Sequence, residues 1–221
     1  SEHVRRLVSE GTRPRLPWAS RLPAFQRDPA PVLALLDKLK DDPALYVRRS
    51  VANNLNDIGK DHPTLLAHTA QAWLQGATPE RRWIVQHALR SAVKRGEAGA
   101  LAALGFGATA KVVLGQPAIT PPRAVIGGSL HVAFDVTNTT AQPQQVLVDF
   151  AVHYVKANGQ ARAKVFKLKT LDLAAHATQR VGKTISLADM TTRKHYPGHH
   201  RVDAILNGRA QALSGFDLSS V

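Results

Sequence analysis

One short segment, SEGTRPRLPW, combines a carboxylate, an aromatic ring and several arginines. Glu10 is expected at the end of a helix, because Gly11 and two prolines follow it and keep the chain extended. Trp18 closes the segment. Such a group suits a phosphate-bearing ligand, with cations on the phosphates and a ring free to stack. The arginines around it are Arg5, Arg6, Arg13, Arg15 and Arg21.

Each of these residues also has a plainer interpretation. A single Glu at a helix terminus is most often solvated surface, and a single Trp is more often part of a core. The cationic side chains gathered around Glu10 and Trp18 are what favour a site over those alternatives.

A second polar cluster lies on a predicted helix whose apolar stripe is spaced by four, four and three: Val47, Val51, Leu55 and Ile58. With that stripe in the core, we expect Asn53, Asn54 and Asp57 to point away from it. Asparagines are poor helix formers, so their presence suggests a use for their donors and acceptors. Arg48 and Arg49 precede them. The alternative is a frayed helix end with Asp57 as a local cap.

A third cluster follows Thr78-Pro79, a capping residue and a first-turn proline that predict a helix start. Helical spacing puts Arg82, Gln86 and Arg90 along one side, as in the basic groove of a helical-repeat protein. Three neighbours on this helix could equally be core: Trp83, Ile84 and His87.

The histidine-rich segment 193–201 invites a metal-site interpretation. Its spacing matches no standard set of metal ligands, and we expect a loop between strands there. Phosphate-cradling glycine loops and serine-hydrolase motifs do not occur in the sequence. We therefore predict no metal site.

The first half of the chain is helical by period and punctuation. Asp28-Pro29 and His62-Pro63 open two successive helical pairs at an offset of 34 residues, which is typical of an α-solenoid. We expect Gly59 to end the helix before the second pair. The helical part is predicted to cover residues 1–108. Two pairs are few for a stable array, and the first residue is Ser1, so we expect further repeats upstream.

The second half changes to short alternating strands. Its proline- and glycine-rich start is predicted to be a linker, residues 109–128, and residues 129–221 an immunoglobulin-like β-sandwich. Asn158-Gly159 and Asn207-Gly208 are hairpin signals. The predicted strands are 130–138, 146–157, 162–173, 178–187, 200–206 and 209–217. The expected fold is therefore multidomain, α then β.

Charge points to a polyanionic partner. The net charge is +13, of which residues 1–115 carry 17 basic and 10 acidic groups (+7) and the remainder 12 and 6 (+6). Both halves could therefore contact one polyanion. The sequence has no cysteine, hence no disulfide, and no stretch apolar for long enough to span a membrane.

Three ordered segments, SEGTRPRLPW, LYVRRSVANNLNDIGKDHP and ERRWIVQHALR, resemble the AlkC branch of the AlkD/AlkC DNA alkylation-repair glycosylases. That family has HEAT-like helical repeats, and some members carry a C-terminal immunoglobulin-like domain. The resemblance implies excision of 3-methyladenine and 3-methylcytosine from double-stranded DNA by a cytoplasmic, nucleoid-associated bacterial monomer. It implies no cofactor. The family also has more helical repeat upstream, where we expect a further active-site carboxylate.

By the same resemblance, Glu10 and Asp57 lie beside the damaged nucleotide and Trp18 packs on it. Arg6 and Arg13 would contact the DNA backbone near the lesion. The full set of expected DNA contacts is Arg6, Arg13, Arg15, Arg48, Arg49, Asn53, Asn54, Arg82, Gln86 and Arg90. Two alternatives remain: a non-catalytic DNA-binding or scaffolding module, and a protein-interaction solenoid with an adhesion-like sandwich.

Overall fold

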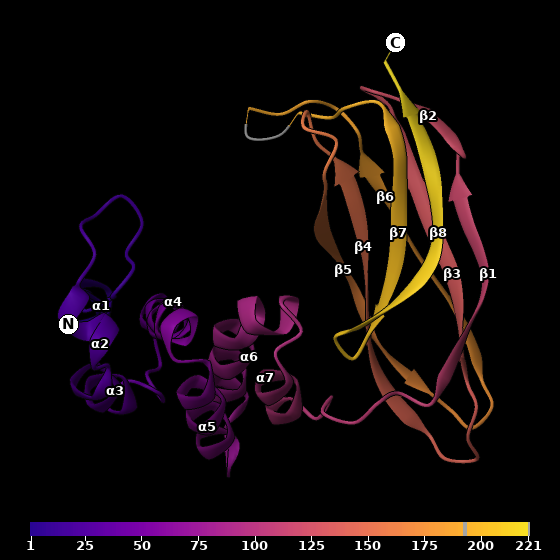
Figure 1. Cartoon of the computed structure of the whole chain (residues 1–221). Helices are drawn as coiled ribbons and strands as arrows, with labels where there is room; N and C mark the ends of the chain where they lie inside the picture. The colour runs from indigo at the N-terminus through magenta and orange to yellow at the C-terminus, as the bar shows by residue number, and fades with distance from the viewer. Residues whose placement is uncertain (192–193, 221) are drawn as a thin grey trace. The chain divides into compact units, whose positions relative to one another are not determined.

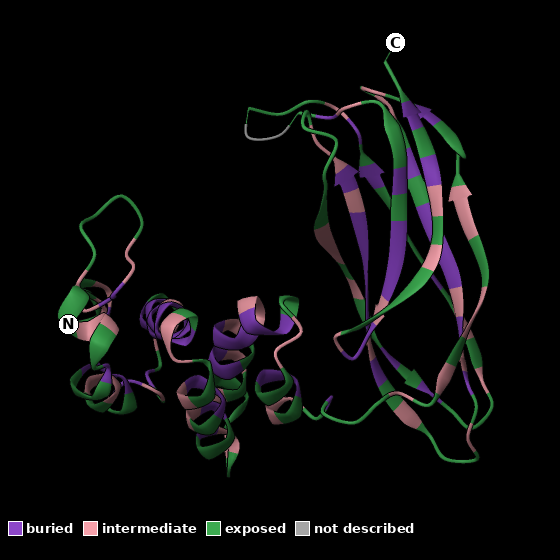
Figure 2. Ribbon diagram, in the orientation of Figure 1, coloured by how far each residue is buried: buried purple, intermediate pink, exposed green. Residues whose placement is uncertain are grey.

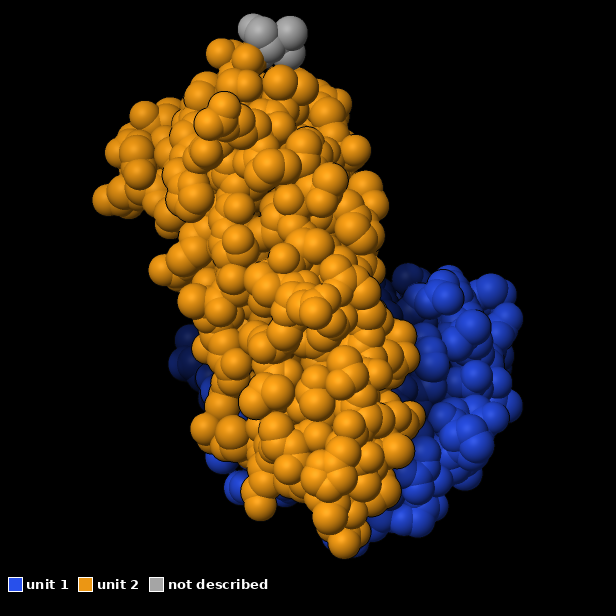
Figure 3. Space-filling view, turned by 90° about the vertical axis from the view of Figure 1, so that its right-hand side faces the viewer, with its two compact units in different colours: residues 1–107 blue, residues 108–221 orange. Residues whose placement is uncertain are grey.

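In the computed structural model, which describes residues 1–191 and 194–220, all helices precede all strands (Figure 1). The chain divides into two units, Ser1–Gly107 and a second that begins at Ala108 (Figure 3). This arrangement confirms the expected α-then-β organisation. Each unit is described by itself below.

The first unit contains helices α1 to α7, several of which begin with a proline in the first turn. Proline suits that position because its missing N–H has no helical partner there. The helices are α1 (Glu2–Gly11), α2 (Pro23–Arg27), α3 (Ala30–Asp37), α4 (Leu45–Asp61), α5 (Pro63–Leu74), α6 (Pro79–Lys94) and α7 (Ala98–Ala103).

Helix α4 lies at the centre of this unit, between α1 on one side and α5 and α6 on others. Its predicted apolar stripe is confirmed, since Val47, Val51, Leu55 and Ile58 are all buried. Figure 2 shows the burial along α4. So much of α4 is covered that four of its polar residues, Ser50, Asn54, Asn56 and Asp57, are buried too, which the stripe alone did not predict.

Gly59 was expected to end α4, and that prediction is wrong, because the helix continues to Asp61. The glycine is instead a point of close approach to α5. A Cβ placed on it would lie 2.2 Å from the Leu66 Cδ2 atom. Gly96, by contrast, follows the end of α6, with φ of +75° and its N–H donating to the Val93 carbonyl at 2.9 Å.

The second unit is a β-sandwich of two sheets, with strand orders β1-β3-β6 and β2-β8-β7-β4-β5. Large side chains from both sheets meet in its core, among them Phe134 on β3 and Phe150 on β4. The strands are β1 (Val112–Thr120), β2 (Arg123–Val125), β3 (Ser129–Asn138), β4 (Gln144–Val155), β5 (Ala161–Leu173), β6 (Thr178–Ser186), β7 (Gly198–Leu206) and β8 (Arg209–Ser219).

The expected linker, residues 109–128, is largely strand. β1 pairs with β3 and β2 pairs with β8, so both belong to the sandwich. Pro117 is accommodated because the β1–β3 register shifts between Gly115 and Ala118. A bulge of this kind tolerates a residue without an N–H, which explains why a proline-rich stretch still forms a strand.

Asn207 and Gly208 form the predicted two-residue turn, since Leu206 pairs with Arg209 and both turn residues have positive φ. The histidine segment was expected to be a loop, but His199 and His200 lie in β7. His200 is fully buried and stacks on Phe216, with ring centroids 5.1 Å apart. Arg193 lies outside the described residues.

Within residues 1–191 and 194–220, no helix is both long and apolar enough to cross a membrane. No group of three or more His, Cys, Asp or Glu side chains in those ranges is placed to hold a metal ion.

Candidate active site

The end of α1 is fixed on α4 by polar contacts. The Asn54 side-chain amide donates to the Ser9 carbonyl at 2.7 Å and to Thr12 Oγ1 at 3.1 Å. Ser50 Oγ lies 3.1 Å from Ser9 Oγ. Asn54 was expected to point away from the core, but it is completely buried because α1 covers that face of α4. Its donors serve the fold.

This docking brings two acids from distant parts of the chain to one guanidinium. Arg13 donates from Nη1 to Glu10 Oε1 at 2.7 Å and from Nε to Asp57 Oδ2 at 2.8 Å. Its Nη2 atom also lies 2.7 Å from Asp57 Oδ2. Glu10 and Asp57 are therefore brought together, and Arg13 lies between them.

Every carboxylate oxygen of the pair has a donor. Ser50 Oγ donates to Glu10 Oε2 at 2.6 Å, and Lys60 Nζ donates to Asp57 Oδ1 at 2.8 Å. The two acids differ in access, because the Asp57 side chain is only 2% exposed and that of Glu10 is 18% exposed. Glu10 therefore lies on the open side of the pair.

The pKa of the Glu10 carboxyl is lowered. Burial acts to raise it, but hydrogen bonds from Ser50 and Arg13 and the positive charges of Arg13 and Arg6 outweigh burial. Glu10 is therefore a carboxylate at neutral pH, suited to stabilise positive charge or orient water and unsuited to donate a proton.

Trp18 lies in the loop between α1 and α2, which extends from the helices in Figure 1. The Leu22 N–H donates to the Pro14 carbonyl at 3.2 Å and closes the base of this loop. Trp18 is fully exposed, at 105%, with φ of +62°. The core interpretation of Trp18 is thus wrong. A bulky residue held exposed in left-handed backbone is a candidate for ligand contact.

Several expected DNA-contacting side chains are engaged within the protein. Arg15 pairs with Asp61. Arg48 donates to the carbonyls of Asp42 and Pro43 at 3.0 and 2.7 Å, in the loop before α4. These contacts position the chain around the site.

Three more members of the expected set, Arg90, Asn53 and Arg6, also contact other residues of the protein. Arg90 on α6 donates to Asn53 Oδ1 at 2.8 Å, which joins α6 to α4. The Arg6 guanidinium lies over the Tyr46 ring, 4.6 Å from its centroid, and 3.8 Å from Glu10.

Three members of the expected set stay exposed: Arg49, Arg82 and Gln86. Beside them, Trp83 and His87 stack with ring centroids 4.9 Å apart. Burial, together with the charges of Arg90 and Arg49, lowers the pKa of His87. Trp83 and His87 are half-buried, whereas their neighbour Ile84 is fully buried in the core.

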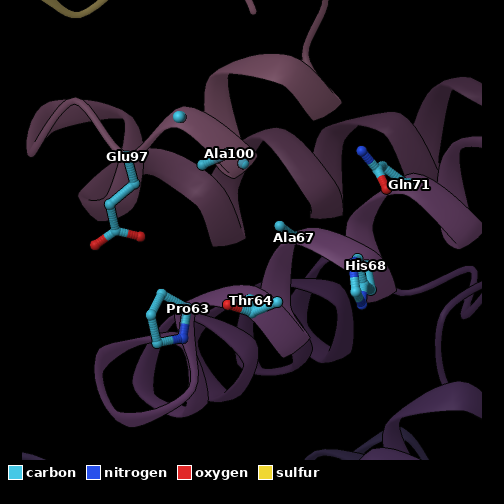
Figure 4. Close-up of a pocket in the computed structure, with 9 residues that line it drawn as sticks. Pro63, Thr64, Ala67, His68, Gln71, Glu97 and Ala100 are labelled. Carbon is cyan, nitrogen blue, oxygen red and sulfur yellow. The ribbon is translucent and has the colours of Figure 1, made fainter.

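A cavity of the helical unit lies away from the carboxylate pair. It has a volume of about 320 Å³, lies between α5 and α7, and is lined by Pro63, Ala67, His68 and Glu97, among others (Figure 4). None of the predicted site residues lines it.

Sequence reasoning missed two members of the site. Lys60 follows Asp57 by three residues, a spacing from which its ion pair could have been predicted. Ser50 carries no such signal, since its contact to Glu10 spans 40 positions and exists only once α1 packs on α4.

The two units together define a class of protein, a HEAT-like helical-repeat unit joined to an immunoglobulin-like domain. Residues 113–220 match the family described as "Uncharacterised protein YhaZ, C-terminal Ig-like domain". The uncharacterized protein YhaZ of Bacillus subtilis (strain 168) is 44% identical over 218 residues, which cover 99% of this chain and 60% of that protein.

A solved structure is also similar to both units of this chain. It is the Pseudomonas fluorescens alkylpurine DNA glycosylase AlkC bound to DNA containing an abasic site analog. It shares 46% identity at a TM-score of 0.96, over 99% of this chain and 61% of that one. Over nearly its whole length the chain is therefore similar to the AlkC branch of the HEAT-like-repeat proteins. It spans about three fifths of the length of these two relatives.

Proposed function

We propose that this chain is part of a DNA N-glycosylase of alkylation repair, which excises cationic N3-alkylated bases such as 3-methyladenine and 3-methylcytosine. The observation that carries the proposal is the pair Glu10 and Asp57, brought to one guanidinium, with Trp18 exposed in the loop that follows Arg13. The 46% identity to an AlkC structure bound to DNA supports it.

The chemistry asked of the pair is modest. An N3-alkylated adenine or cytosine already carries a positive charge, so it can leave without a proton from the enzyme. As the bond between the base and C1′ of the sugar breaks, the bonding electrons go to the base and the sugar becomes an oxocarbenium-like cation. A nearby carboxylate stabilises that cation.

Water completes the reaction. It adds to C1′, and its proton passes to a carboxylate or to solvent, leaving an abasic site and the neutral free base. Glu10 is the better placed to orient this water, because it is the more exposed acid of the two. Asp57, behind it, adds negative charge. The proposed reaction calls for no cofactor, because the leaving base brings its own charge.

The exposed cations serve the backbone of the DNA. Arg49 and Arg82 are free to contact phosphates, and Gln86 lies on the same helix as Arg82. Trp18 would pack against the damaged nucleotide at the surface, where its side chain is fully exposed. The substrate is then a duplex gripped from one side, by a protein acting as a monomer.

A second function is favoured by one observation. Asp57 is almost fully covered, and each of its oxygens already has a donor within the protein. A chain of this kind could bind DNA without acting on it, as a non-catalytic module of the same fold.

Base release from methylated duplex DNA separates the two functions. It is measured by chromatography of the free bases, for the 221-residue chain and for a chimera that supplies the remainder of the AlkC chain. Release of 3-methyladenine that falls about a hundredfold in Asp57→Asn supports the glycosylase. The unfolding midpoint of Asp57→Asn is measured alongside, because Asp57 also pairs with Arg13.

If both proteins bind DNA without releasing a base, and Asp57→Asn and Glu10→Gln bind DNA as wild type does, the chain is a non-catalytic binding module. Loss of release together with loss of folding would point to a structural role for the pair.

A further inference from the structure

We infer that Arg13 is a positioning residue, which holds the Glu10 and Asp57 carboxylates together, and that it does not contact DNA phosphate. This inference rests on the proposed function for the role of the two acids. It replaces the expectation that Arg13 grips the DNA backbone.

The geometry of the contacts carries the inference. One planar guanidinium uses Nη1 for Glu10 and both Nε and Nη2 for Asp57, all at 2.7 to 2.8 Å. Only Arg presents donors in a fork with fixed directions; the ammonium group of Lys is a single point. The two acids come from α1 and α4, so Arg13 sets their separation across two elements.

Burial argues against a phosphate contact. The Arg13 side chain is 9% exposed, while the side chains of Arg5 and Arg6 are 39% and 36% exposed. Its single charge is already opposed by two carboxylates. A phosphate brought to it would meet those carboxylates as well, and like charges at short range repel.

Two carboxylates held close together repel each other, so the cations around them matter for the arrangement. The cations that interact with this pair include Arg6 on α1, Arg13 and Arg15 after it, Lys60 on α4 and Arg90 on α6. Of these, only Arg13 bonds to both acids. Arg13 therefore offsets the repulsion that would otherwise push the two carboxylates apart.

The test compares Arg13→Gln and Arg13→Lys with wild type in the whole chain and in the chimera. Three quantities are measured: the single-turnover rate of base release, the salt dependence of DNA binding, and the pKa of the Glu10 carboxyl by NMR. Ser50→Ala is added because Ser50 is buried and donates a hydrogen bond to Glu10. This variant therefore changes the surroundings of the Glu10 carboxylate without removing a group that could contact DNA.

Two controls bracket the result. Arg5→Gln breaks another arginine–aspartate pair of α1, with Asp42, that touches neither acid of the site. It reports on general loosening of the helix. Arg49→Gln removes an exposed cation of α4 and reports how a phosphate contact changes the salt dependence.

A positioning role predicts that Arg13→Gln slows release about a hundredfold. The slope of log K against log salt should stay as in wild type, and the Glu10 pKa should rise. Arg13→Lys keeps the positive charge but lacks the forked guanidinium donors. It should therefore restore the Glu10 pKa more fully than the rate of base release. Ser50→Ala should slow release and also raise the Glu10 pKa, and Arg5→Gln should do neither.

A phosphate contact predicts a different pattern, with a slope smaller by about 0.9 in Arg13→Gln, as in Arg49→Gln, and an unchanged Glu10 pKa. That pattern would overturn the inference. If wild type releases no base, the proposed function fails, and the slope and the Glu10 pKa still decide the role of Arg13. If Arg13→Gln does not fold, the same two measurements on Arg13→Lys and Ser50→Ala decide it.

Discussion

The Asn54 side-chain amide lies 2.7 Å from the Ser9 carbonyl, and this hydrogen bond fixes the end of α1 on α4. Ser9 precedes Glu10, so this contact also fixes the backbone from which the Glu10 side chain extends. A buried amide that serves the backbone of another helix explains why α4 keeps an asparagine at a position poor for helix propensity.

Asn54→Ala should destabilise the helical unit by about 1–3 kcal/mol, because a buried carbonyl and the Thr12 hydroxyl lose their donor. Urea unfolding followed by circular dichroism measures the change. Gln71→Ala, an exposed polar residue of α5, serves as the matched control and should stay within about 0.5 kcal/mol of wild type. Equal stability of the two variants would show that the Asn54 bonds contribute nothing.

The stability contributed by Glu10 should depend on pH. Its pKa is lowered in the folded chain, since the hydrogen bonds from Ser50 and Arg13 and the nearby arginine charges outweigh burial. Such a group contributes stability that is present above its unfolded pKa of about 4.5 and is lost as the pH falls through the folded pKa.

Glu10→Gln should therefore be less stable than wild type near neutral pH, and the gap should narrow at about pH 3. Denaturant midpoints of both proteins at the two pH values measure it. Glu2→Gln, on the same helix, is the control for charge alone. A gap that widens on acidification would contradict the lowered pKa.

Trp18→Ala should separate binding from stability. The side chain is fully exposed, so its loss should change the free energy of unfolding by less than about 0.5 kcal/mol. Loss of a stacking platform should weaken binding to DNA with an abasic site by roughly tenfold. Fluorescence anisotropy gives the affinity. Trp18→Phe keeps a ring and should recover part of it; a full loss in both variants would argue against stacking.

Two neighbouring arginines should behave differently. Arg49 is exposed, whereas Arg48 donates to the carbonyls of Asp42 and Pro43. Arg49→Gln and Arg82→Gln should each lower the salt slope of DNA binding by about 0.9. Arg48→Gln should leave the slope alone and lower the unfolding midpoint. If all three variants show the same salt slope of DNA binding, Arg49 and Arg82 do not contact phosphates.

Gly59→Ala should destabilise the unit by about 1–3 kcal/mol, because the new Cβ would lie 2.2 Å from Leu66 Cδ2 and α5 would have to shift. Gly11→Ala is the control, since nothing lies within 4 Å of its Cβ position. Thermal unfolding of the two variants measures the difference. A neutral Gly59→Ala would mean that α4 and α5 separate at little cost.

Local pattern was sufficient for most of the fold. The stripe from Val47 to Ile58 predicted α4, because burial of one helical face imposes the spacing of its apolar residues. Asn207-Gly208 predicted the β7–β8 turn, because few residue pairs adopt two successive positive φ angles. The strand β1 was missed, since its pairing with β3 overrides a local composition typical of linkers.

The candidate site divides in the same way. The sequence alone determined that Glu10, Asp57, Trp18 and many arginines are present, and its likeness to the AlkC branch indicated which acids to examine. Only the tertiary structure decided that Asn54 faces α1 and that Arg13 lies between the two acids. The contact between Arg13 and Asp57 joins residues 44 positions apart, and no local periodicity encodes a pairing that forms when one helix covers another.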